Sequence, residues 1–577
     1  MAESSDFSTV LCKDDRIAKI TDAVKYSVFK GGSNVTFSRY KAISGVNATG
    51  PTSLVFNLQV PSEQVVVDRR VKLVSTFSFN VSITLPADAG VLAALVGARP
   101  FDYGNNCALG PYPVHSLFSS MNVTINNNST SIQEQEILAQ IIRLYDERVH
   151  QRSASGTPNS WDTCADYTQL VDATSNPLGG YDNVADTDIQ PRGSWYVSQV
   201  NLAGNNGNNP IAIGEVGAVR TVTYTVTTEE YLQISPFIFN KSYHSQGFLG
   251  IQTLNFQFQI GTPQRLFRHS GVANNGTVMN AANGASPAVV SNLNFSNSEL
   301  VFQFLSLHPS DILPSRNVVP YYDLPLYKTA TTLTQALVPM DGTNNVIDQI
   351  QTSTFSLNQI PDKLVIWVTP KPFGNYTCQD ADAWMVIEKI SIQFNNSQGI
   401  LSNCDSRDLW KMSVQAGSNQ SWADWSGQTL RASGGQTPDR LRMCGSVLML
   451  DMGKDVQLSD DFLSCGSIGQ FSLSLQIQFK NPFSYNVTQP NCTIMCLNSG
   501  LWVVDRGQSS SFTGILTKSL VLDASQRESV SRSDGERLVG SGLGSGASSM
   551  GPALASGSAG PAFSGVTGSG KLQARFK

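Results

Sequence analysis

The sequence predicts an all-β chain in which two similar domains follow one another. Charged residues make up 14% of it, well below the ~25% of an average globular protein, and Gly, Asn, Ser and Thr take their place. One long segment alternates strictly between apolar and polar residues. A series of strand, turn and helix patterns occurs twice in the same order. Strands joined by turn-rich loops, in two copies, explain all three observations.

The clearest strand of the first half spans residues 73–85. Leu73, Phe77 and Phe79 fall on one face and Ser78 on the other, as in a sheet with one buried side. Further strands of this half are predicted at 35–40, 54–60, 121–125, 222–226, 254–260 and 300–307.

An amphipathic helix is predicted at residues 133–148, after an Asn-rich turn at 126–129. Its start carries the capping-box pattern Ser131-x-x-Glu134. Apolar residues spaced by three and four follow, so one side of the helix is expected to pack beside a sheet.

The second half repeats these patterns in order. The strand, Asn-turn and helix series returns at 390–394, 395–398 and 405–416, and Ser421-Trp422 matches Ser160-Trp161. Four other pairs of segments match: Tyr327-Lys328-Thr329 with Tyr40-Lys41-Ala42, 364–368 with 65–67, 471–479 with 254–260, and 493–504 with 300–307. Any all-β chain repeats strand-like patterns by chance, but a conserved order of several landmarks favours an internal duplication.

The domain boundary is placed in a proline-rich connector, because prolines at this density disfavour regular structure. Two polar segments, 151–217 and 270–290, are predicted to be long surface loops. The predicted parts are an N-terminal arm at 1–22, a first domain at 23–308, a linker at 309–320, a second domain at 321–523 and a disordered Gly/Ser/Ala-rich tail at 524–577.

Charge and cysteine content restrict the function. The net charge is −5 and residues 1–10 hold no Lys or Arg, so the chain lacks the kind of basic arm that neutralises and condenses single-stranded RNA. The nine cysteines form neither a disulfide framework nor a zinc pattern. We find no signal peptide and no apolar run of membrane-spanning length. Folding in a reducing compartment is expected.

No catalytic motif stands out, and neither a cofactor nor a metal ion is expected. The five histidines are scattered, and the glycines near residue 540 lack the strand and helix of a nucleotide site. Cys492 and Cys496 are expected on the same side of a strand as small buried residues. Asp323, Asp362 and Asp382 could meet in space, and Trp161, Trp422 and Trp425 could line a sugar platform or serve packing.

Several segments resemble motifs of the major capsid proteins of virophages, Polinton-like viruses and adintoviruses. The resemblance spans roughly residues 24–523. It is carried by Pro61-Ser-x-x-Val-Val-Val-Asp68-Arg69, Gly247-Phe-Leu-Gly-Ile-Gln252, Pro314-Ser-Arg-Asn-Val-Val-Pro320, Leu357-Asn-Gln-Ile-Pro-Asp-Lys363 and Ser421-Trp422.

The resemblance implies two tandem eight-stranded jelly rolls that stand upright in a viral shell. It implies homotrimers with a pseudo-hexameric outline that tile an icosahedral virion, with penton and minor capsid proteins as further partners. The genome would be double-stranded DNA without direct sequence-specific binding by this chain, which would be made in the host cytoplasm. The loops 151–217 and 270–290 would crown the capsomer.

The tail contains one pattern similar to the sites cut by adenovirus-type maturation proteases. Leu538-Val-Gly540-Ser541-Gly542 matches Leu-x-Gly-x-Gly, which predicts cleavage after Ser541 by a maturation protease of the virus. Short Gly/Ser-rich patterns of this kind also arise by chance.

Two alternatives remain open from the sequence. One is a two-domain β-sandwich protein that binds carbohydrate or acts as a glycosidase, which would need an aromatic and carboxylate cleft. The other is the capsid protein of a single-stranded RNA virus, which the missing basic arm disfavours. The leading prediction is a non-enzymatic major capsid protein.

Overall fold

The structure is a computed structural model that describes residues 34–520 except for 63, 104–105, 111, 145–194, 238–246, 270, 272, 274–278, 280–285, 307–315, 341–345, 372–377, 379–382, 432–438, 459–462, 484, 506 and 518. The predicted arm, Trp161, Asp382 and the predicted cleavage residues Gly540, Ser541 and Gly542 lie outside the described residues.

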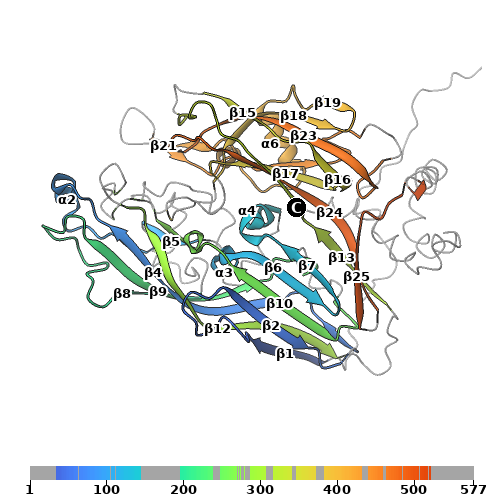
Figure 1. Cartoon of the computed structure of the whole chain (residues 1–577), viewed down its shortest axis with the longest axis horizontal. Coiled ribbons are helices and arrows are strands. Elements are labelled where there is room, and N and C mark those ends of the chain that lie inside the picture. The colour runs from blue at the N-terminus through green and yellow to red at the C-terminus, as the bar shows by residue number, and fades with distance from the viewer. Residues whose placement is uncertain are drawn as a thin grey trace, which may run out of the picture.

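The first domain is a sandwich of two antiparallel sheets (Figure 1). One has the order β1-β12-β4-β9-β8, with β3 also paired to β12, and the other has the order β2-β10-β6-β7. Their bounds are β1 Asn34–Lys41, β2 Ser53–Gln59, β3 Val65–Val67, β4 Lys72–Thr84, β6 Phe118–Ile125, β7 Asn128–Ile132, β8 Tyr196–Asn201, β9 Val219–Tyr231, β10 Thr253–Ile260 and β12 Val289–Ser306. The short strands β5 (Cys107–Leu109) and β11 (Phe267–His269) pair with each other.

The second domain repeats this arrangement. Its sheets are β13-β24-β17-β22, with β14 and β25 also paired to β24, and β15-β23-β18-β19, with β16 paired to β23. Their bounds are β13 Asn317–Asp323, β14 Leu326–Ala330, β15 Asp348–Gln351, β16 Phe355–Gln359, β17 Lys363–Thr369, β18 Val386–Phe394, β19 Ser397–Ile400, β22 Leu448–Asp451, β23 Ile468–Lys480, β24 Asn491–Asp505 and β25 Gln508–Thr513. A hairpin of β20 (Gln428–Arg431) and β21 (Asp439–Arg442) stands apart.

Both sandwiches have the connectivity of a jelly roll. In chain order the eight principal strands of the first are β1, β2, β4, β6, β7, β9, β10 and β12, and they form the sheets 1-8-3-6 and 2-7-4-5. The second domain gives the same two sheets when β14 and β16 are taken as its first and second strands, followed by β17, β18, β19, β22, β23 and β24. These are the paired Greek keys of a double jelly roll, and they confirm the predicted fold class.

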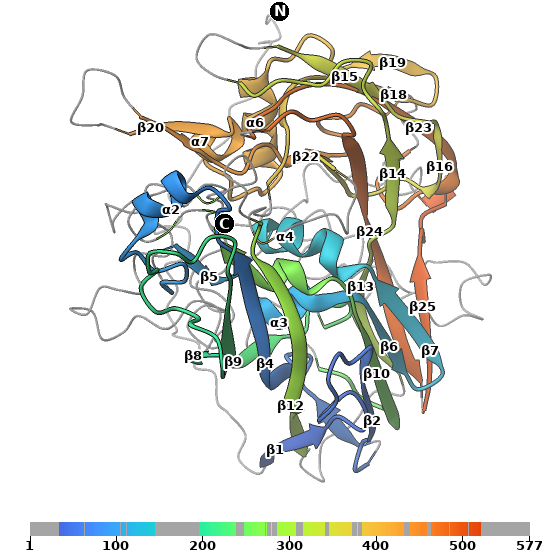
Figure 2. The ribbon, with the colours of Figure 1, turned by 60° about the vertical axis from the view of Figure 1, so that its left-hand side comes forward.

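Helices are few and lie in the connections. Those of the first domain are α2 (Ala89–Leu95), α3 (Pro113–Leu117), α4 (Glu134–Leu144) and the 3-10 turn η2 (Pro263–Leu266). Those of the second are α6 (Ser406–Gln415) and α7 (Trp422–Trp425). Figure 1 shows α4 between the first domain and the second. Figure 2 shows β1, β12, β4, β9 and β8 side by side in the first domain.

Alternation of side chains builds each core. Along β4, Leu73, Phe77 and Phe79 are fully buried between the sheets, as their period predicted. In the second domain the core is built in the same way, with Ile390 and Ile392 of β18 and Leu473 of β23 buried between the sheets.

Four expectations about local structure were wrong. The capping box at the start of α4 does not form, because Ser131 lies in β7 and the Glu134 carboxylate has no hydrogen-bond partner among the described residues. The polar region 151–217 contains the strand β8, which pairs with β9, and β12 already begins within the predicted loop 270–290. The predicted linker 309–320 overlaps β13, where Pro320 is tolerated because this strand ends its sheet. The segment 364–368 corresponds to β4 rather than to 65–67, since both β17 and β4 lie between the last strand and the sixth.

Candidate assembly surfaces and the seam between the domains

The Asn-rich turn is built identically in both domains. Asn126 and Asn395 have positive φ angles of 53° and 50°, which asparagine tolerates better than most residues. Each side-chain oxygen accepts a hydrogen bond from the residue opposite it on the neighbouring strand, from Thr253 N at 3.3 Å in the first domain and from Ser472 N at 2.8 Å in the second. Each backbone N–H donates to the carbonyl of that same residue at 2.9 Å. The predicted duplication of this stretch is therefore confirmed at the level of single hydrogen bonds.

The helices that follow these turns, α4 and α6, are also counterparts. Ile137 and Ile141 of α4 are fully buried, and so are Leu409 and Ser413 of α6, which have the same spacing of four. Both helices follow the fifth strand of their jelly roll and precede the sixth. We therefore align Ile137 with Leu409 and Ile141 with Ser413, which gives each residue of α4 a counterpart in α6.

Helix α4 lies in a seam between the two domains (Figure 1) and is buried along its length apart from the half-buried Glu136. The Arg143 guanidinium lies 4.5 Å from the ring centre of Trp384 in the second domain, within the range of a cation–π contact. Lys328 of β14 donates a hydrogen bond to Glu136 Oε1 at 2.6 Å. Asn419 N donates to Arg143 O at 3.3 Å.

Strand β17 shows how the second domain contributes to this seam. Leu364 and Ile366 point into its own core. The alternate residues Val365 and Trp367 belong to the core that is continuous with the first domain. This strand is therefore buried on both faces, which explains why its central residues, 364–368, are all apolar. It also explains why the two domains form one packed unit.

Helix α6 has a more open environment than α4. Its exposed charged residues Asp408 and Lys411 pair with each other at 3.6 Å, with side chains 50% and 62% exposed. Val414 is 42% exposed. Exposed ion pairs of this kind contribute little stability, so the outer side of α6 is a solvated surface in the isolated chain.

A buried lysine fastens α6 to its domain. Lys363 forms an ion pair with Asp451, its cross-strand partner on β22, and donates a hydrogen bond at 2.6 Å to Ala416 O at the C-terminal end of α6. Burial raises the pKa of the neighbouring Asp362 to about 6, against a hydrogen bond from Ser499 that lowers it. A cation at this point both neutralises a buried carboxylate and caps the helix.

The larger sheet of the first domain keeps an open outer face within the described residues. Its edge strand β1 exposes Val35 and Phe37 at 52% and 64%, and its other edge strand β8 exposes Tyr196 and Val200 at 55% and 62%. Between them the face is rich in threonine and serine, with the hydrogen bonds Thr76–Thr227 and Ser82–Thr221. Exposed apolar edges of a sheet are typical contact sites for another chain.

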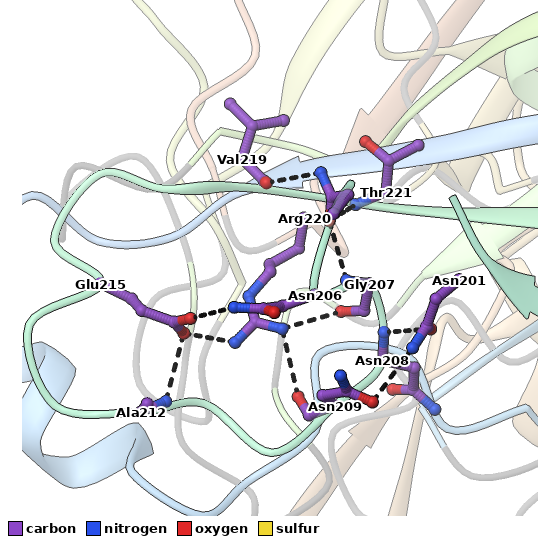
Figure 3. Close-up of polar contacts among 11 residues, drawn as sticks. Asn201, Asn206, Gly207, Asn208, Asn209, Ala212, Glu215, Val219, Arg220 and Thr221 are labelled. Atoms are coloured by element: carbon purple, nitrogen blue, oxygen red, sulfur yellow. Dashed lines mark hydrogen bonds and ion pairs between the residues drawn. The ribbon is translucent and has the colours of Figure 1, made fainter. Parts of the chain in front are cut away.

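The loop between β8 and β9 is organised around one buried arginine (Figure 3). Arg220 is 1% exposed, and its guanidinium donates to the carbonyls of Gly207 and Asn209 at 3.4 Å and pairs with Glu215. Partial burial raises the pKa of Glu215, but hydrogen bonds from Arg220, Ala212 and Asn206 outweigh it and hold that pKa below its usual range.

Asparagine side chains complete this loop (Figure 3). Asn205 accepts hydrogen bonds from Gly207 N and Thr221 N and donates to Val219 O. The fixed loop presents Ile213 to solvent with 87% of the residue exposed. The described part of the predicted crown loop is therefore held by a polar network rather than being free chain.

We expect Arg220→Ala to unfold this loop locally, because two backbone carbonyls and the Glu215 carboxylate lose their common donor. The cost should be about 2–4 kcal/mol, as for other buried pairs that lose one partner. Hydrogen exchange should become faster across 202–218. The matched control is Ile213→Ala at the exposed tip, which should leave exchange unchanged; equal effects of both changes would contradict the role of the guanidinium.

A buried acidic cluster lies beside α4. His115 Nδ1 and Glu230 Oε2 are 2.6 Å apart with both side chains fully buried, and Val114 N also donates to Glu230. Glu134 is fully buried too, and within the described chain neither of its carboxyl oxygens has a hydrogen-bond partner. Burial, and then the negative charge of Glu230, raise the pKa of Glu134 well above its usual value.

This cluster gives a pH dependence with a defined sign. Because the folded state holds the Glu134 proton more tightly than the unfolded chain does, the associated stability is present below the ordinary glutamate pKa and is lost as the pH rises through the raised value. We expect Glu134→Gln to match the parent near pH 4 and to exceed it by about 1–3 kcal/mol near pH 8, the usual cost of an unpaired buried polar group.

Guanidinium unfolding between about pH 4 and about pH 9 measures this difference. A smaller slope should remain in the variant, because the pKa of Asp362 is raised to about 6 by burial. Glu388→Gln, at an ion-paired surface position, is the control and should shift stability by a similar amount at all these pH values. A Glu134→Gln curve parallel to that of the parent would contradict the assignment.

The residues that the sequence singled out are mostly structural. Cys492 and Cys496 are buried in the second core, as predicted, and burial raises the pKa of each thiol to about 12. Trp425 is fully buried, and Trp422 lies edge-on to Trp410 at 5.7 Å. Trp425 therefore serves packing rather than a sugar platform.

The predicted carboxylates have separate partners. Burial raises the pKa of Asp323, which accepts a hydrogen bond from Asn498, whereas Asp362 accepts one from Ser499. In the described residues no group of three or more His, Cys, Asp or Glu side chains could hold a metal ion. No helix in the same ranges is long and apolar enough to cross a membrane.

Sequence reasoning did not single out Arg220 or Arg143. It named Glu134 only as part of a capping box and Lys363 only within a motif, and predicted a buried charge at neither. A charged residue inside an otherwise apolar strand, as at Lys363 before Leu-Val-Ile-Trp-Val, is the one signal that pointed to a buried charge. Arg220 and Glu134 carry no such signal, because their burial depends on distant segments.

The chain contains two jelly rolls of equal connectivity, joined through a buried helix. This arrangement is typical of the double jelly-roll proteins that build viral shells. Residues 5–305 match the family described as Sputnik virophage major capsid protein 1st domain, and residues 327–500 match major capsid protein V20 C-terminal domain. The chain belongs to the family of virophage major capsid proteins, the structural, non-catalytic components of the icosahedral virion shell.

Individual relatives agree with this assignment. The putative capsid protein V20 of Sputnik virophage is 26% identical over 524 residues, covering 89% of this chain and 81% of the relative. The cryo-EM structure of Sputnik virophage is similar with a TM-score of 0.73 at 24% identity, covering 91% of this chain and 97% of the other. The crystal structure of the mavirus major capsid protein follows with 0.66 at 13% identity, covering 90% and 99%.

This assignment selects the predicted shell protein over the carbohydrate-binding or glycosidase alternative and over a single-stranded RNA virus capsid.

Proposed function

We propose that this major capsid protein works as a homotrimer whose six jelly rolls give the capsomer a pseudo-hexameric outline. The observation that carries the proposal is the identical strand order of the two domains. A chain with two equivalent domains supplies a ring of six equivalent positions when three copies close around an axis. The open edges at β1 and β8 provide surfaces through which copies can meet.

Native mass spectrometry of the purified full chain tests the proposal, and we expect a stable trimer. Obligate contacts of this kind bury more than about 2,000 Å², so the trimer should survive dilution to nanomolar chain. Negative-stain images should show hexagonal particles. A strict monomer under conditions that permit assembly would count against the proposal.

The surroundings of the trimer follow from the same proposal. Penton and minor capsid proteins are the further partners we expect, and the enclosed genome is double-stranded DNA. The net charge of −5 supports a shell that does not itself bind nucleic acid in a sequence-specific way. The exposed loop that carries Ile213 is suited to the outer crown of the capsomer.

We further propose that a maturation protease of the virus cleaves the tail after Ser541, at the peptide bond between Ser541 and Gly542. Gly540 precedes the cleaved residue. The Gly/Ser/Ala composition of this segment supports access by a protease. Intact-mass measurement of protein from mature virions should show a C-terminus at Ser541. Gly540→Val is the matched variant and should retain the whole tail; a full-length parent chain in mature virions would refute cleavage.

A further inference from the structure

One sheet face is covered by α4 in the second domain, whereas the matching face of the first domain leaves its outer lysine, Lys41, 78% exposed. The covered face carries the cross-strand row Lys328, Thr493 and Trp367, where Lys328 pairs with Thr493 on β24 and Trp367 pairs with the same residue from the other side. Thr493 and Trp367 are 3% and 2% exposed, and both line the seam with Glu136 of α4.

The first domain contains the matching row. Lys41 pairs with Glu299 on β12, and Val74 of β4 pairs with Glu299 from the other side. The rows correspond because the residue before Lys41 and the residue before Lys328 are both tyrosines that pack into their cores. Lys41 nevertheless has a side chain that is 78% exposed, compared with 35% for Lys328.

The helices correspond in the same way. With Ile137 aligned to Leu409, Glu136 of α4 takes the position of Asp408 of α6. Glu136 binds Lys328 across the seam. Asp408 has only its own helix neighbour Lys411 as an ion-pair partner among the described side chains.

We propose that α6 of one copy covers the Lys41–Glu299–Val74 row of a second copy, as α4 covers the matching row within the chain. Asp408 then forms an ion pair with Lys41 of the second copy. This inference rests on the proposed trimer and adds the residues that join its subunits. The contact is heterologous, since two different surfaces meet, and such contacts close into a ring when the rotation permits.

Charge and polarity support this occupant. The row in the first domain offers two exposed cations, Lys41 and Arg39, on either side of the largely buried Glu299. Helix α6 offers the exposed carboxylate of Asp408, so the two surfaces have complementary charges. The seam within the chain is apolar, with Trp367 and Trp384. The Lys41 row and the outer side of α6 are more polar than this seam, as expected where the separate chains must remain soluble before they meet.

Zero-length carbodiimide cross-linking tests the contact in the unaltered protein. Chains labelled with ¹⁴N and with ¹⁵N are mixed before assembly, and the cross-linked trimer is digested and analysed by mass spectrometry. We expect an amide between Lys41 and Asp408 in which the two peptides carry different isotopes. The built-in control is Lys328–Glu136, which should cross-link only between peptides of the same isotope.

Charge exchange provides an independent measurement. Asp408→Lys and Lys41→Asp should each raise the concentration at which the trimer dissociates by about tenfold or more, because like charges then face each other. The double variant Asp408→Lys with Lys41→Asp should recover most of the loss. Cross-linking of Lys328 to Glu136 checks that every variant is folded.

The outcomes separate this inference from the proposal on which it rests. Trimers that lack a mixed-isotope Lys41–Asp408 product and that tolerate both single changes overturn the α6 contact and leave the trimer standing. A protein that stays monomeric while Lys328 still cross-links to Glu136 overturns the trimer itself. Lys41 also cross-links to Glu299 of its own chain, so only the Lys41–Asp408 product decides. A Lys41–Asp408 product confined to single-isotope pairs would show that α6 of the same chain covers this row, and it also overturns the inference.

Discussion

Lys363→Met should lower the free energy of unfolding by about 3–5 kcal/mol, the usual result of removing one partner from a buried ion pair. Lys363 is 3% exposed and Asp451 5% exposed. Methionine fills a similar volume but leaves the buried Asp451 carboxylate with only the exposed Lys454 near it, and leaves Ala416 O without its donor. The end of α6 should therefore loosen as the domain loses stability.

Denaturant unfolding measures this change, and the chain contains a matched control. Lys454 approaches the same carboxylate at 3.8 Å but is 60% exposed, so Lys454→Met should cost less than about 1 kcal/mol. Adding Asp451→Leu to Lys363→Met should restore much of the stability, because the pair is then replaced by apolar groups. Equal losses from the two lysine variants would contradict the buried role of Lys363.

Trp384→Ala should have a comparable effect at the seam, with a loss of about 3–5 kcal/mol for a buried tryptophan. Trp384 is 3% exposed and is stacked by Arg143 of the other domain. Its removal takes away apolar contact on both sides of the seam. We expect the single unfolding transition of the parent to separate into two, because the domains then unfold with less mutual support.

Differential scanning calorimetry resolves these transitions. The control is Trp195→Ala, where the residue is 41% exposed and the change should be below about 1 kcal/mol. One unchanged cooperative transition in Trp384→Ala would show that the seam does not couple the domains.

Local patterns predicted the parts of the fold that depend on neighbours in sequence. The alternation through Phe77 and Phe79 located β4, and the Asn-turn copies located Asn126 and Asn395 at equal points of the two jelly rolls. In each case the signal lies within a few residues, because strand period and turn conformation are local properties.

The parts that depend on distant partners could not be predicted. Pro320 indicated irregular chain, yet a place at the end of a sheet accommodates it. The segment at 364–368 was matched to the wrong strand, since composition does not reveal which neighbours a strand pairs with. Glu134 has nothing in its own sequence context to show that α3, β6 and the second domain enclose its helix.

The seam also affects when the protein becomes ready to assemble. Both jelly rolls belong to one chain, so α4 meets its partner sheet at an effective concentration on the order of millimolar, however dilute the protein is. Early in an infection, when few copies exist, the seam between the two domains already forms at its full rate. Only the contacts between chains wait for protein to accumulate, so the onset of shell growth depends on concentration while the shape of each subunit does not.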